Sequence, residues 1–376
     1  MAQLDDPLLA VIVEEMEDHP EKRISFRRYM ELALYHPRWG YYRREGLKVG
    51  KRGDFYTSPQ LGEVFGETLG RVISGMVPSF SPGCPWTLVE VGGGDGRLAE
   101  SILASLMEEK RLPQSLWLVE TSPLHQNLQR ERLQNAPVPV YWAEAMTEIP
   151  EGAPCILYSN EFLDALPVHR VTRKGGELQE IYVTWDKHRE GFMECSLPLR
   201  HPPLLAYFRN LDWNLSEGWT VEVPLDALDW LEAVSDWMKT GYLITIDYGG
   251  TTEELSQPQR KNGTLRCYRN HQLHENFYFQ PGTSDITSHV NFSVMQDYGE
   301  KLGFRKCMYT TQPRFLQAAG ILERWLEPPR DPFSPEARHN RAIRQLALPG
   351  GMGESFRVLI QSKGVAVPQR GLRGVT

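Results

Sequence analysis

The chain has 376 residues, with 41 Lys and Arg against 48 Asp and Glu and a formal net charge of −7 at pH 7. This length suits two domains or one enlarged α/β domain, and the acidic balance argues against nucleic acid as a partner. With 41% hydrophobic and 24% charged residues, the composition is far from that of disordered or membrane proteins.

The amino-terminal segment and the cysteines bear on the compartment. The first residues, MAQLDDPLLAVIVEEMEDHP, carry acids where a secretory or mitochondrial signal carries Lys or Arg, and no apolar run approaches the length that spans a bilayer. The five scattered cysteines include no CxxC pair, which indicates reduced thiols rather than a zinc or redox site. We therefore expect a cytoplasmic protein that binds neither membranes nor nucleic acids.

A helical cap is predicted over residues 1–85. Apolar residues recur at helical spacing in three segments, 6–18, 24–35 and 62–76. Residues 35–62 between them form a loop rich in glycine, aromatic and basic residues, and loops of this length are commonly functional. A cluster of Pro, Ser and Gly at 78–85 ends the region and serves as the first boundary.

From Trp86 onward, short apolar runs alternate with helical segments, which is typical of a parallel sheet covered by helices on both faces. The expected strands are 87–91, 115–120, 138–144, 155–159 and 242–247. The expected helices between them are 97–110, 124–134 and 225–238. We divide this core into a first half, 86–165, and a second half, 225–363, followed by a flexible tail at 364–376.

Two further segments interrupt this core. Residues 166–224 form an insertion, in which VHRVTRKGGELQEIYVTW alternates across a Gly-Gly turn and predicts a β-hairpin. Residues 248–292 are expected to be a second long loop. After it, the sequence predicts a helix at 294–303 and two strands, FRKCMY and FRVLIQ, with helical spacing at 313–326 and 335–346 between the strands.

The strongest signal for a ligand is LVEVGGGDGRLAESIL, in which a buried strand runs through Gly92, Gly94 and Gly96 into a helix. Glycine lets a ligand approach the backbone closely, and the amino terminus of the helix offers free N–H groups. In an open α/β sheet such a turn lies at the carboxyl ends of the strands, where ligands bind. We therefore expect a cofactor here.

The spacing favours S-adenosylmethionine over other nucleotides. A P-loop needs Gly-Lys-Ser/Thr, which is absent, and Arg97 stands where a dinucleotide fingerprint read from Gly92 needs a small residue. The next strand ends in Glu120, which can accept both ribose hydroxyls of an adenosine, and Glu144 after the third strand is a candidate adenine contact. Glu90 disfavours a pyrophosphate at the turn but suits a sulfonium.

An acidic corner is predicted after the fourth strand, where SNEFLDALPVHR places Asn160, Glu161 and Asp164 at the same end of the sheet as the glycine turn. Glu161 and Asp164 are three residues apart, so on a helical turn they share one face. Paired carboxylates can hold the planar fork of a guanidinium and polarise one nitrogen. We expect both acids to be catalytic and Asn160 to contact the cofactor; the alternative is that Asp164 caps a helix and Glu161 is a surface acid.

Several blocks beyond the glycine turn carry a family resemblance: HPRWGYY, GDFYTSP with EVFGETLG, NEFLDALPVHR, ITIDYG and CYRNHQLHENFYFQPGTSDITSHVNFS. In their order and spacing the chain resembles the MidA/NDUFAF-seven type of class I S-adenosylmethionine-dependent methyltransferases, the former DUF185 group, over most of its length. The resemblance implies a Rossmann-like, seven-stranded α/β sheet whose last two strands, FRKCMY and FRVLIQ, are antiparallel. It also implies S-adenosylhomocysteine as the product of the donor.

The resemblance further implies roles for residues of the first loop and the helix after it. One block would close over the donor, and a second would pack beneath it: Gly53, Asp54, Phe55, Thr57, Ser58 and Pro59, then Phe65, Gly66 and Glu67. The mitochondrial relatives are implied to dimethylate an arginine of a respiratory complex I subunit. This sequence departs from many relatives at Asn291, where they carry Asp, and near Gly93 and Asp95, where they carry Arg or Pro.

The histidines are weaker candidates. His289, near Asp285 and Thr287, is a candidate proton acceptor or orienting group, although a lone loop histidine is more often structural. His271 and His274 are spaced like two ligands on a helical turn, but no third ligand accompanies them, so no metal is expected.

Three functions stay open at this point. The first is methylation of an arginine in a partner protein. The second is O- or N-methylation of a small molecule in a pocket walled by Tyr268, Phe277, Tyr278 and Phe279. The third is a non-catalytic assembly factor for which S-adenosylmethionine is a structural ligand. A homodimer is among the expected assemblies.

Overall fold

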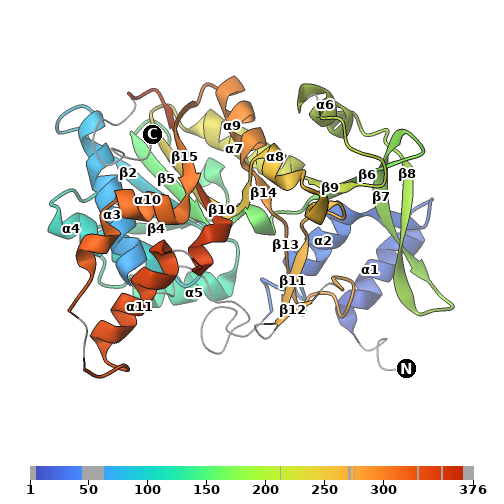
Figure 1. The fold of residues 1–376 in the computed structure, drawn as a ribbon, viewed down its shortest axis with the longest axis horizontal. Helices are drawn as coiled ribbons and strands as arrows, with labels where there is room; N and C mark the ends of the chain where they lie inside the picture. The colour runs from blue at the N-terminus through green and yellow to red at the C-terminus, as the bar shows by residue number, and fades with distance from the viewer. Residues whose placement is uncertain are drawn as a thin grey trace.

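The computed structural model describes residues 6–44, 63–211, 213–269, 272–274, 276–327, 330–348 and 350–366. Its centre is a mostly parallel sheet in the strand order β4-β3-β2-β5-β10-β16-β15 (Figure 1). The seven strands are β2 (Thr87–Val91), β3 (Ser115–Val119), β4 (Val140–Ala143), β5 (Cys155–Asn160), β10 (Gly241–Gly250), β15 (Arg305–Thr311) and β16 (Phe356–Lys363). Because β16 runs antiparallel to both β10 and β15, the predicted sheet and its antiparallel last pair are confirmed.

Apolar side chains on both faces of the strands explain why helices cover the sheet on two sides. In β2, Leu88 belongs to the core on one face and Val89 to the core on the other; Ile156 and Leu157 of β5 divide in the same way. The first core includes helices drawn at the left of Figure 1: α3 (Glu63–Met76), α4 (Arg97–Glu108), α10 (Gln312–Ala318) and α11 (Pro335–Ala347). The second includes α7 (Leu225–Trp237) and α9 (Phe292–Lys301).

Side-chain caps fix where several helices begin. Asp6 accepts the N–H of Leu8 at 3.0 Å at the start of α1 (Pro7–Asp18), and Ser25 accepts the N–H of Arg28 at 3.2 Å at the start of α2 (Phe26–Tyr35). Ser122 takes the same position before α5 (Pro123–Arg132), which packs beside α4. Such caps satisfy N–H groups that the helix itself leaves free, so these starts are encoded locally.

A second sheet joins the amino-terminal cap to the insertion. Its order is β1-β7-β6-β9, with β8 on the other edge of β7. The strands are β1 (Arg23–Ser25), β6 (His169–Lys174), β7 (Glu177–Asp186), β8 (Gly191–Pro198) and β9 (Thr220–Val223), and α6 (Pro202–Leu211) packs on them. The hairpin predicted across Gly175 and Gly176 is confirmed, and both glycines have positive φ. The pairing of β1 with β7 was not predicted, because three residues are too few to show alternation.

The segment 248–292 is not a loop throughout, which corrects the sequence-based expectation. It contains α8 (Thr252–Leu255), the short β14 (Val290–Asn291) paired with β10, and a three-stranded antiparallel sheet. The strands of that sheet are β11 (Arg266–Arg269), β12 (Gln272–His274) and β13 (Asp285–Thr287). Strands of three or four residues carry too little periodicity to be recognised from sequence. His274, expected on a helical turn, lies in a strand.

The small sheet completes a separate core under the cap. Residues of α1 and α2 pack there with Val183 of β7, Cys267 of β11 and Ile286 of β13. The cap helices and the sheet of β6 to β9 therefore stand together at the right of Figure 1, beside the central sheet. This arrangement leaves the carboxyl ends of the central strands facing α2.

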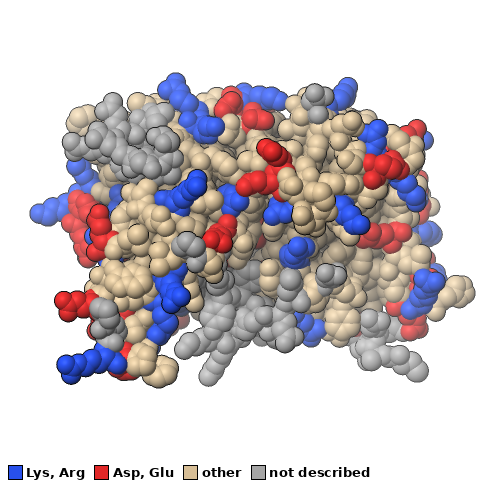
Figure 2. Space-filling model, in the orientation of Figure 1, with Lys and Arg blue, Asp and Glu red and all other residues tan. Residues whose placement is uncertain are grey.

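The surface and the thiols agree with the composition. Figure 2 shows basic and acidic side chains interspersed over the face in view. All five cysteines are free. Within the described ranges, no helix combines the length and hydrophobicity needed to cross a membrane.

Candidate active site

A cavity of about 580 Å³ lies at the carboxyl ends of the central strands. It is bordered by the ends of β2, β3 and β5 and by α2 of the cap. Its volume falls within the range of small-molecule and cofactor sites, and its position is where open α/β sheets bind ligands. Many of the described lining residues are apolar or aromatic, but among the charged and titratable ones acids outnumber bases: Glu31, Glu90, Asp95, Glu120, Glu144, Glu161, Asp164, Asp226 and Asp285, against Arg97 and His125.

The glycine turn has the backbone that the sequence predicts. Gly92, Gly94 and Gly96 have φ angles of +69°, +53° and +78°, which side chains rarely adopt. A Cβ on Gly92 would lie 3.0 Å from the ring of Phe162, whereas one on Gly94 would meet no described atom within 4 Å. Gly96 is the N-cap of α4. The turn therefore presents bare backbone and the start of a helix to the cavity.

Glu90 lies directly under this turn. Its carboxylate is so close that a Cβ on Gly93 would stand 2.5 Å from Oε2 of Glu90. Burial raises the pKa of the Glu90 carboxyl well above its ordinary value, and the charges of Asp95 and Glu120 raise it further. A cation in the cavity would favour the ionised form, so the site has latent affinity for positive charge.

Glu120 and Glu144 close the side of the cavity formed by β3 and β4. Oε1 of Glu120 accepts the N–H of Ser122 at 2.8 Å, and Oε2 lies 3.5 Å from Nδ1 of His125. These contacts hold the buried Glu120 carboxylate at the end of β3. Glu144 is exposed, and its own N–H donates to Glu148 at 3.3 Å.

The acidic corner follows β5 and faces the same cavity. Nδ2 of Asn160 donates to Oε1 of Glu161 at 3.0 Å, and Asp164 is buried in a 3₁₀ turn, Leu163–Ala165. Glu161 precedes that turn and has a φ of +52°, so the two acids do not share one helical face as expected. A glutamate in this left-handed conformation is strained, and such strain is concentrated at functional sites. Both acids nevertheless line the cavity.

Asp247, in β10 directly after the last residue of that strand that pairs with β5, holds the acidic corner in place. Its Oδ2 accepts the N–H groups of Phe162 at 3.1 Å, Leu163 at 2.8 Å and Asp164 at 3.3 Å, and its Oδ1 accepts that of Tyr248 at 2.8 Å. Sequence reasoning assigned Asp247 no role, although an acid inside the apolar strand YLITID was an available signal. Burial raises the pKa of Asp247 to about 7, and these hydrogen bonds oppose that rise.

Burial also raises the pKa of Asp164 well above its ordinary value, with further increases from the charges of Asp247, Glu161 and Asp285. Four carboxyl groups thus crowd one side of the cavity. Such crowding favours the protonated form of a buried carboxyl, and nearby positive charge favours the ionised form.

The cap contributes residues that sequence reasoning did not assign to the cavity. Tyr42 donates to Oδ1 of Asp285 at 2.8 Å, and Tyr35 donates to the carbonyl of Ala165 at 3.0 Å. The N–H of Ser288 in turn donates to the carbonyl of Asp164 at 2.9 Å. The acidic corner is therefore enclosed by segments that lie far apart in the sequence.

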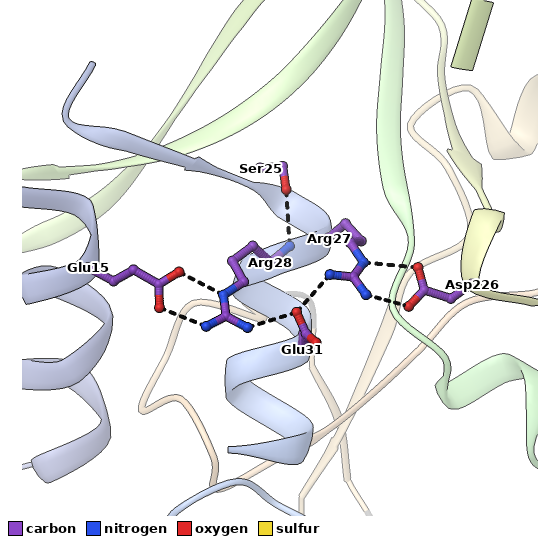
Figure 3. Close-up of polar contacts among 6 residues, drawn as sticks. All are labelled: Glu15, Ser25, Arg27, Arg28, Glu31 and Asp226. Carbon is purple, nitrogen blue, oxygen red and sulfur yellow. Dashed lines mark hydrogen bonds and ion pairs between the residues drawn. The ribbon is translucent and has the colours of Figure 1, made fainter. Parts of the chain in front are cut away.

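Two arginines of α2 tie the cap to the core (Figure 3). Arg27 binds Asp226 of α7 through two hydrogen bonds of 2.9 and 2.8 Å and binds Glu31 at 2.7 Å. Arg28 binds Glu31 at 2.9 Å and holds Glu15 of α1 at 2.7 and 3.0 Å. Because Glu31 and Asp226 both line the cavity, this network fixes the cavity wall that α2 and α7 share.

Other predicted residues lie elsewhere or outside the described chain. His289 is not among the residues lining the cavity, and burial together with Arg260, Arg266 and Arg357 lowers its pKa to about 4. Phe65, Gly66 and Glu67, expected beneath the donor, lie in α3 at its contact with α4, where a Cβ on Gly66 would stand 2.4 Å from Cβ of Ser101.

The block expected to close over the donor, with Gly53, Asp54, Phe55, Thr57, Ser58 and Pro59, lies outside the described residues, as does His271. Among the residues that the structure does describe, no three His, Cys, Asp or Glu side chains are grouped as metal ligands.

Comparison with known proteins identifies the chemistry of the cavity. Residues 68–310 match the sequence profile of Methyltransf_28, a family described as S-adenosyl-L-methionine-dependent methyltransferases. The chain is 27% identical to the mitochondrial protein arginine methyltransferase NDUFAF7 homolog of Drosophila melanogaster, covering 91% of this chain and 82% of that protein. It is 29% identical to mitochondrial NDUFAF7 of Danio rerio, covering 89% and 82%.

A solved structure agrees. A COG1565 superfamily member from Burkholderia thailandensis, bound to S-adenosyl-homocysteine, superimposes with a TM-score of 0.87 at 29% identity, covering 98% of this chain and 95% of that one. A second structure of that superfamily from the same organism gives a TM-score of 0.83 at 30% identity, covering 96% and 92%.

The comparisons correct the prediction of a cytoplasmic location. The curated relatives are named as mitochondrial proteins, which contradicts the expectation of a cytoplasmic protein. The prediction was wrong because it relied on the acids of the amino-terminal segment.

The cavity fits the donor that these comparisons imply, S-adenosylmethionine. The bare backbone at Gly94 leaves room for a ligand, and the surrounding acids match a sulfonium and an ammonium group. Oδ1 of Asn160 and Nε1 of Trp230 belong to residues that line the cavity, and both atoms are buried without a hydrogen-bond partner among the described residues. Buried polar atoms of this kind commonly pair with a ligand.

Proposed function

Because the chain belongs to the Methyltransf_28 family of S-adenosyl-L-methionine-dependent methyltransferases, we propose that it methylates an arginine side chain of a partner protein. The relatives from Drosophila melanogaster and Danio rerio are named as protein arginine methyltransferases, which supports this acceptor. The family establishes methyl transfer as the reaction. The arginine acceptor is the step that we add.

The observation that carries the proposal is the excess of carboxylates around the cavity. Among the described lining residues, nine acids outnumber one arginine and one histidine, which favours a cationic acceptor such as a guanidinium over an anionic one. The acids of the corner also lie deep, since Asp164 and Asp247 are both buried. Burial raises the pKa of both carboxyls and so favours their protonated form. A cation that enters the cavity would favour their ionised form.

Glu161 and Asp164 are the residues that we assign to the acceptor. Their carboxylates would bind the guanidinium fork and orient one nitrogen toward the glycine turn. The donor, when bound, supplies an electrophilic methyl group on a sulfonium. As the nitrogen gains the methyl group it loses a proton, and a carboxylate of the acidic corner would accept that proton. Asp247 would act through the backbone N–H groups that it holds.

We assign the donor to the opposite side of the cavity. Gly92, Gly94 and Gly96 would contact it through bare backbone, Glu120 would bind its ribose hydroxyls, and Glu144 would lie near its adenine. Glu90 and Asn160 would lie near its charged end. Asp54, Thr57, Ser58 and Pro59 stay part of this assignment, although they lie outside the described residues. A homodimer remains our expectation for the assembly.

The test is methyl transfer to arginine. The purified protein is incubated with donor carrying a labelled methyl group and a library of arginine peptides, each matched by a lysine version, and products are mapped by mass spectrometry. We expect label on arginine only, and a strong loss of it in Glu161→Gln but not in Glu151→Gln, an exposed acid outside the cavity lining.

Two results would contradict the proposal. Label confined to small molecules of a cell extract would make the acceptor a metabolite. Donor binding without transfer to any peptide or extract component would indicate a non-catalytic factor. Light scattering on the same preparation reports whether a homodimer forms.

A further inference from the structure

A second, smaller cavity lies in the cap, away from the glycine turn. Its volume is about 230 Å³, below the range typical of whole cofactors, so it suits the head of a side chain. It is bordered by the start of α1, the hairpin of β7 and β8, and the segment before β13. Four aromatic residues and two acids are among its lining: Trp185, Phe192, Tyr278 and Phe279, with Asp6 and Glu190.

The aromatic rings form a corner rather than a flat stack. Trp185 and Phe192 have ring centroids 5.1 Å apart at 77°, and Phe192 and Tyr278 lie 5.8 Å apart at 37°. Phe279 is 44% exposed, and the guanidinium of Arg269 lies 5.9 Å from its ring centroid. Rings at differing angles can surround a cation, and Phe279 already contacts one.

The charged side chains that line this cavity are the acids Asp6 and Glu190. No Lys or Arg is among its described lining residues. Asp6 is partly neutralised, because it caps α1 and lies 3.7 Å from Arg44. Glu190 is exposed in the turn between β7 and β8. Aromatic rings with a nearby carboxylate are the chemistry that binds a weakly hydrated cation.

We propose that this cavity binds the methylated guanidinium of an arginine side chain. Methylation leaves the positive charge but removes N–H donors, so the methylated group loses fewer hydrogen bonds to water on entering an aromatic pocket. A plain guanidinium makes more hydrogen bonds to water, so it loses more of them where it packs against the aromatic rings of this cavity. The choice of a methylated arginine as the ligand rests on the proposed function, but the binding itself requires no methyl transfer by this protein and is tested without the donor.

The second cavity is close to the first along the chain. Pro281 lines the second cavity and Asp285 the first, and four residues of chain span at most about 14 Å. A partner protein that carries more than one arginine could therefore place a methylated residue in one cavity while the other receives an acceptor.

The experiment is fluorine NMR of the full chain labelled with 5-fluorotryptophan, with the Trp185 signal assigned through Trp185→Phe. The probes are N-acetyl arginine amide and its monomethylated and symmetrically dimethylated forms, added without donor. We expect the Trp185 signal to move with the methylated probes, which should bind about threefold more tightly than the plain form. Glu190→Gln and Phe279→Ala should each weaken this binding about threefold, whereas Glu177→Gln, an exposed acid of β7 outside the lining, should not.

Three outcomes would overturn the proposal. Equal affinity for methylated and plain probes would remove the selectivity. A response of Trp230, which lines the first cavity, without one of Trp185 would place binding in that cavity. Unchanged affinity for the methylated probes in both Glu190→Gln and Phe279→Ala would show that the ligand does not contact these side chains. This result would overturn the proposal even if the protein proves to methylate arginine.

Discussion

The glycine turn and the acidic corner face one cavity but are built in different ways. The turn is local: its three left-handed glycines lie within five residues, and the helix that they start follows at once. The corner depends on distant residues, since Asp247 binds backbone groups 83 to 85 positions away and Tyr35 of the cap binds Ala165. The difference indicates that the glycine turn is encoded in one motif, whereas the acidic corner is assembled by the whole fold.

Asp247→Asn should break the acidic corner while sparing the turn, and it is the largest effect that we expect. An amide would direct an NH₂ group at backbone donors that now bind a carboxylate oxygen, and each buried donor left unpaired costs about 1–3 kcal/mol. Methyl transfer should fall at least about 100-fold, equivalent to about 2.7 kcal/mol of barrier. Calorimetric affinity for S-adenosylmethionine should change only a few-fold, and a parallel loss of donor affinity would show that the two regions are not independent.

Gly94→Val should disrupt the glycine turn, on the opposite side of the cavity from the acidic corner. At a φ of +53° a β-branched residue is strained, and its side chain would enter space that no described atom occupies. We expect calorimetric affinity for S-adenosylmethionine to fall at least about tenfold.

The matched control for this substitution is Gly83→Val. Gly83 also has a positive φ, +74°, and open space at its Cβ, but it lies outside the cavity. Equal loss of donor binding in both variants would trace the effect to backbone strain.

The pH dependence of the free energy of unfolding should report on the buried carboxyls of the acidic corner. The carboxyls of Asp164 and Asp247 have pKa values raised above the ordinary 3.8, so the folded chain binds protons more tightly than the unfolded chain. Their contribution to stability is therefore greatest below about pH 4 and is lost as pH rises through about 7, the pKa of Asp247. Urea unfolding at pH 5 and pH 8 should show this loss, and Asp164→Asn should reduce it. An identical pH dependence in the variant would refute the assignment.

Glu161→Gly should change stability and activity in opposite directions, and its effect on stability is the smallest that we expect. Glycine relieves the left-handed strain at Glu161, which should stabilise the fold by about 0.5–1 kcal/mol, while removal of the carboxylate lowers methyl transfer. Lys110→Gly is the control, because Lys110 is exposed with a φ of +54° and lies outside the cavity. The midpoint temperature of thermal unfolding should rise in both variants. Methyl-transfer activity should fall only in Glu161→Gly.

Much of this molecule was predictable from local sequence. The parallel strands, the helices on both faces, the hairpin at Gly175 and Gly176 and the left-handed glycines after β2 all follow from periodicity and backbone preference. The family resemblance rests on contiguous blocks and was confirmed by the comparisons. These features share one property, which is that their information lies within about ten neighbouring residues.

The tertiary structure decided the rest. Only the fold brings Asp247 beneath the acidic corner, sets Asp285 against Tyr42, and joins Arg27 to Asp226 across 199 positions. It also pairs β1 with β7 and turns an expected loop into the small sheet of β11 to β13. A sequence specifies which groups can bond, but burial and distance decide which of them meet. The sequence by itself therefore determined the fold class and the glycine turn, whereas the arrangement of the acidic corner arises from contacts between distant segments.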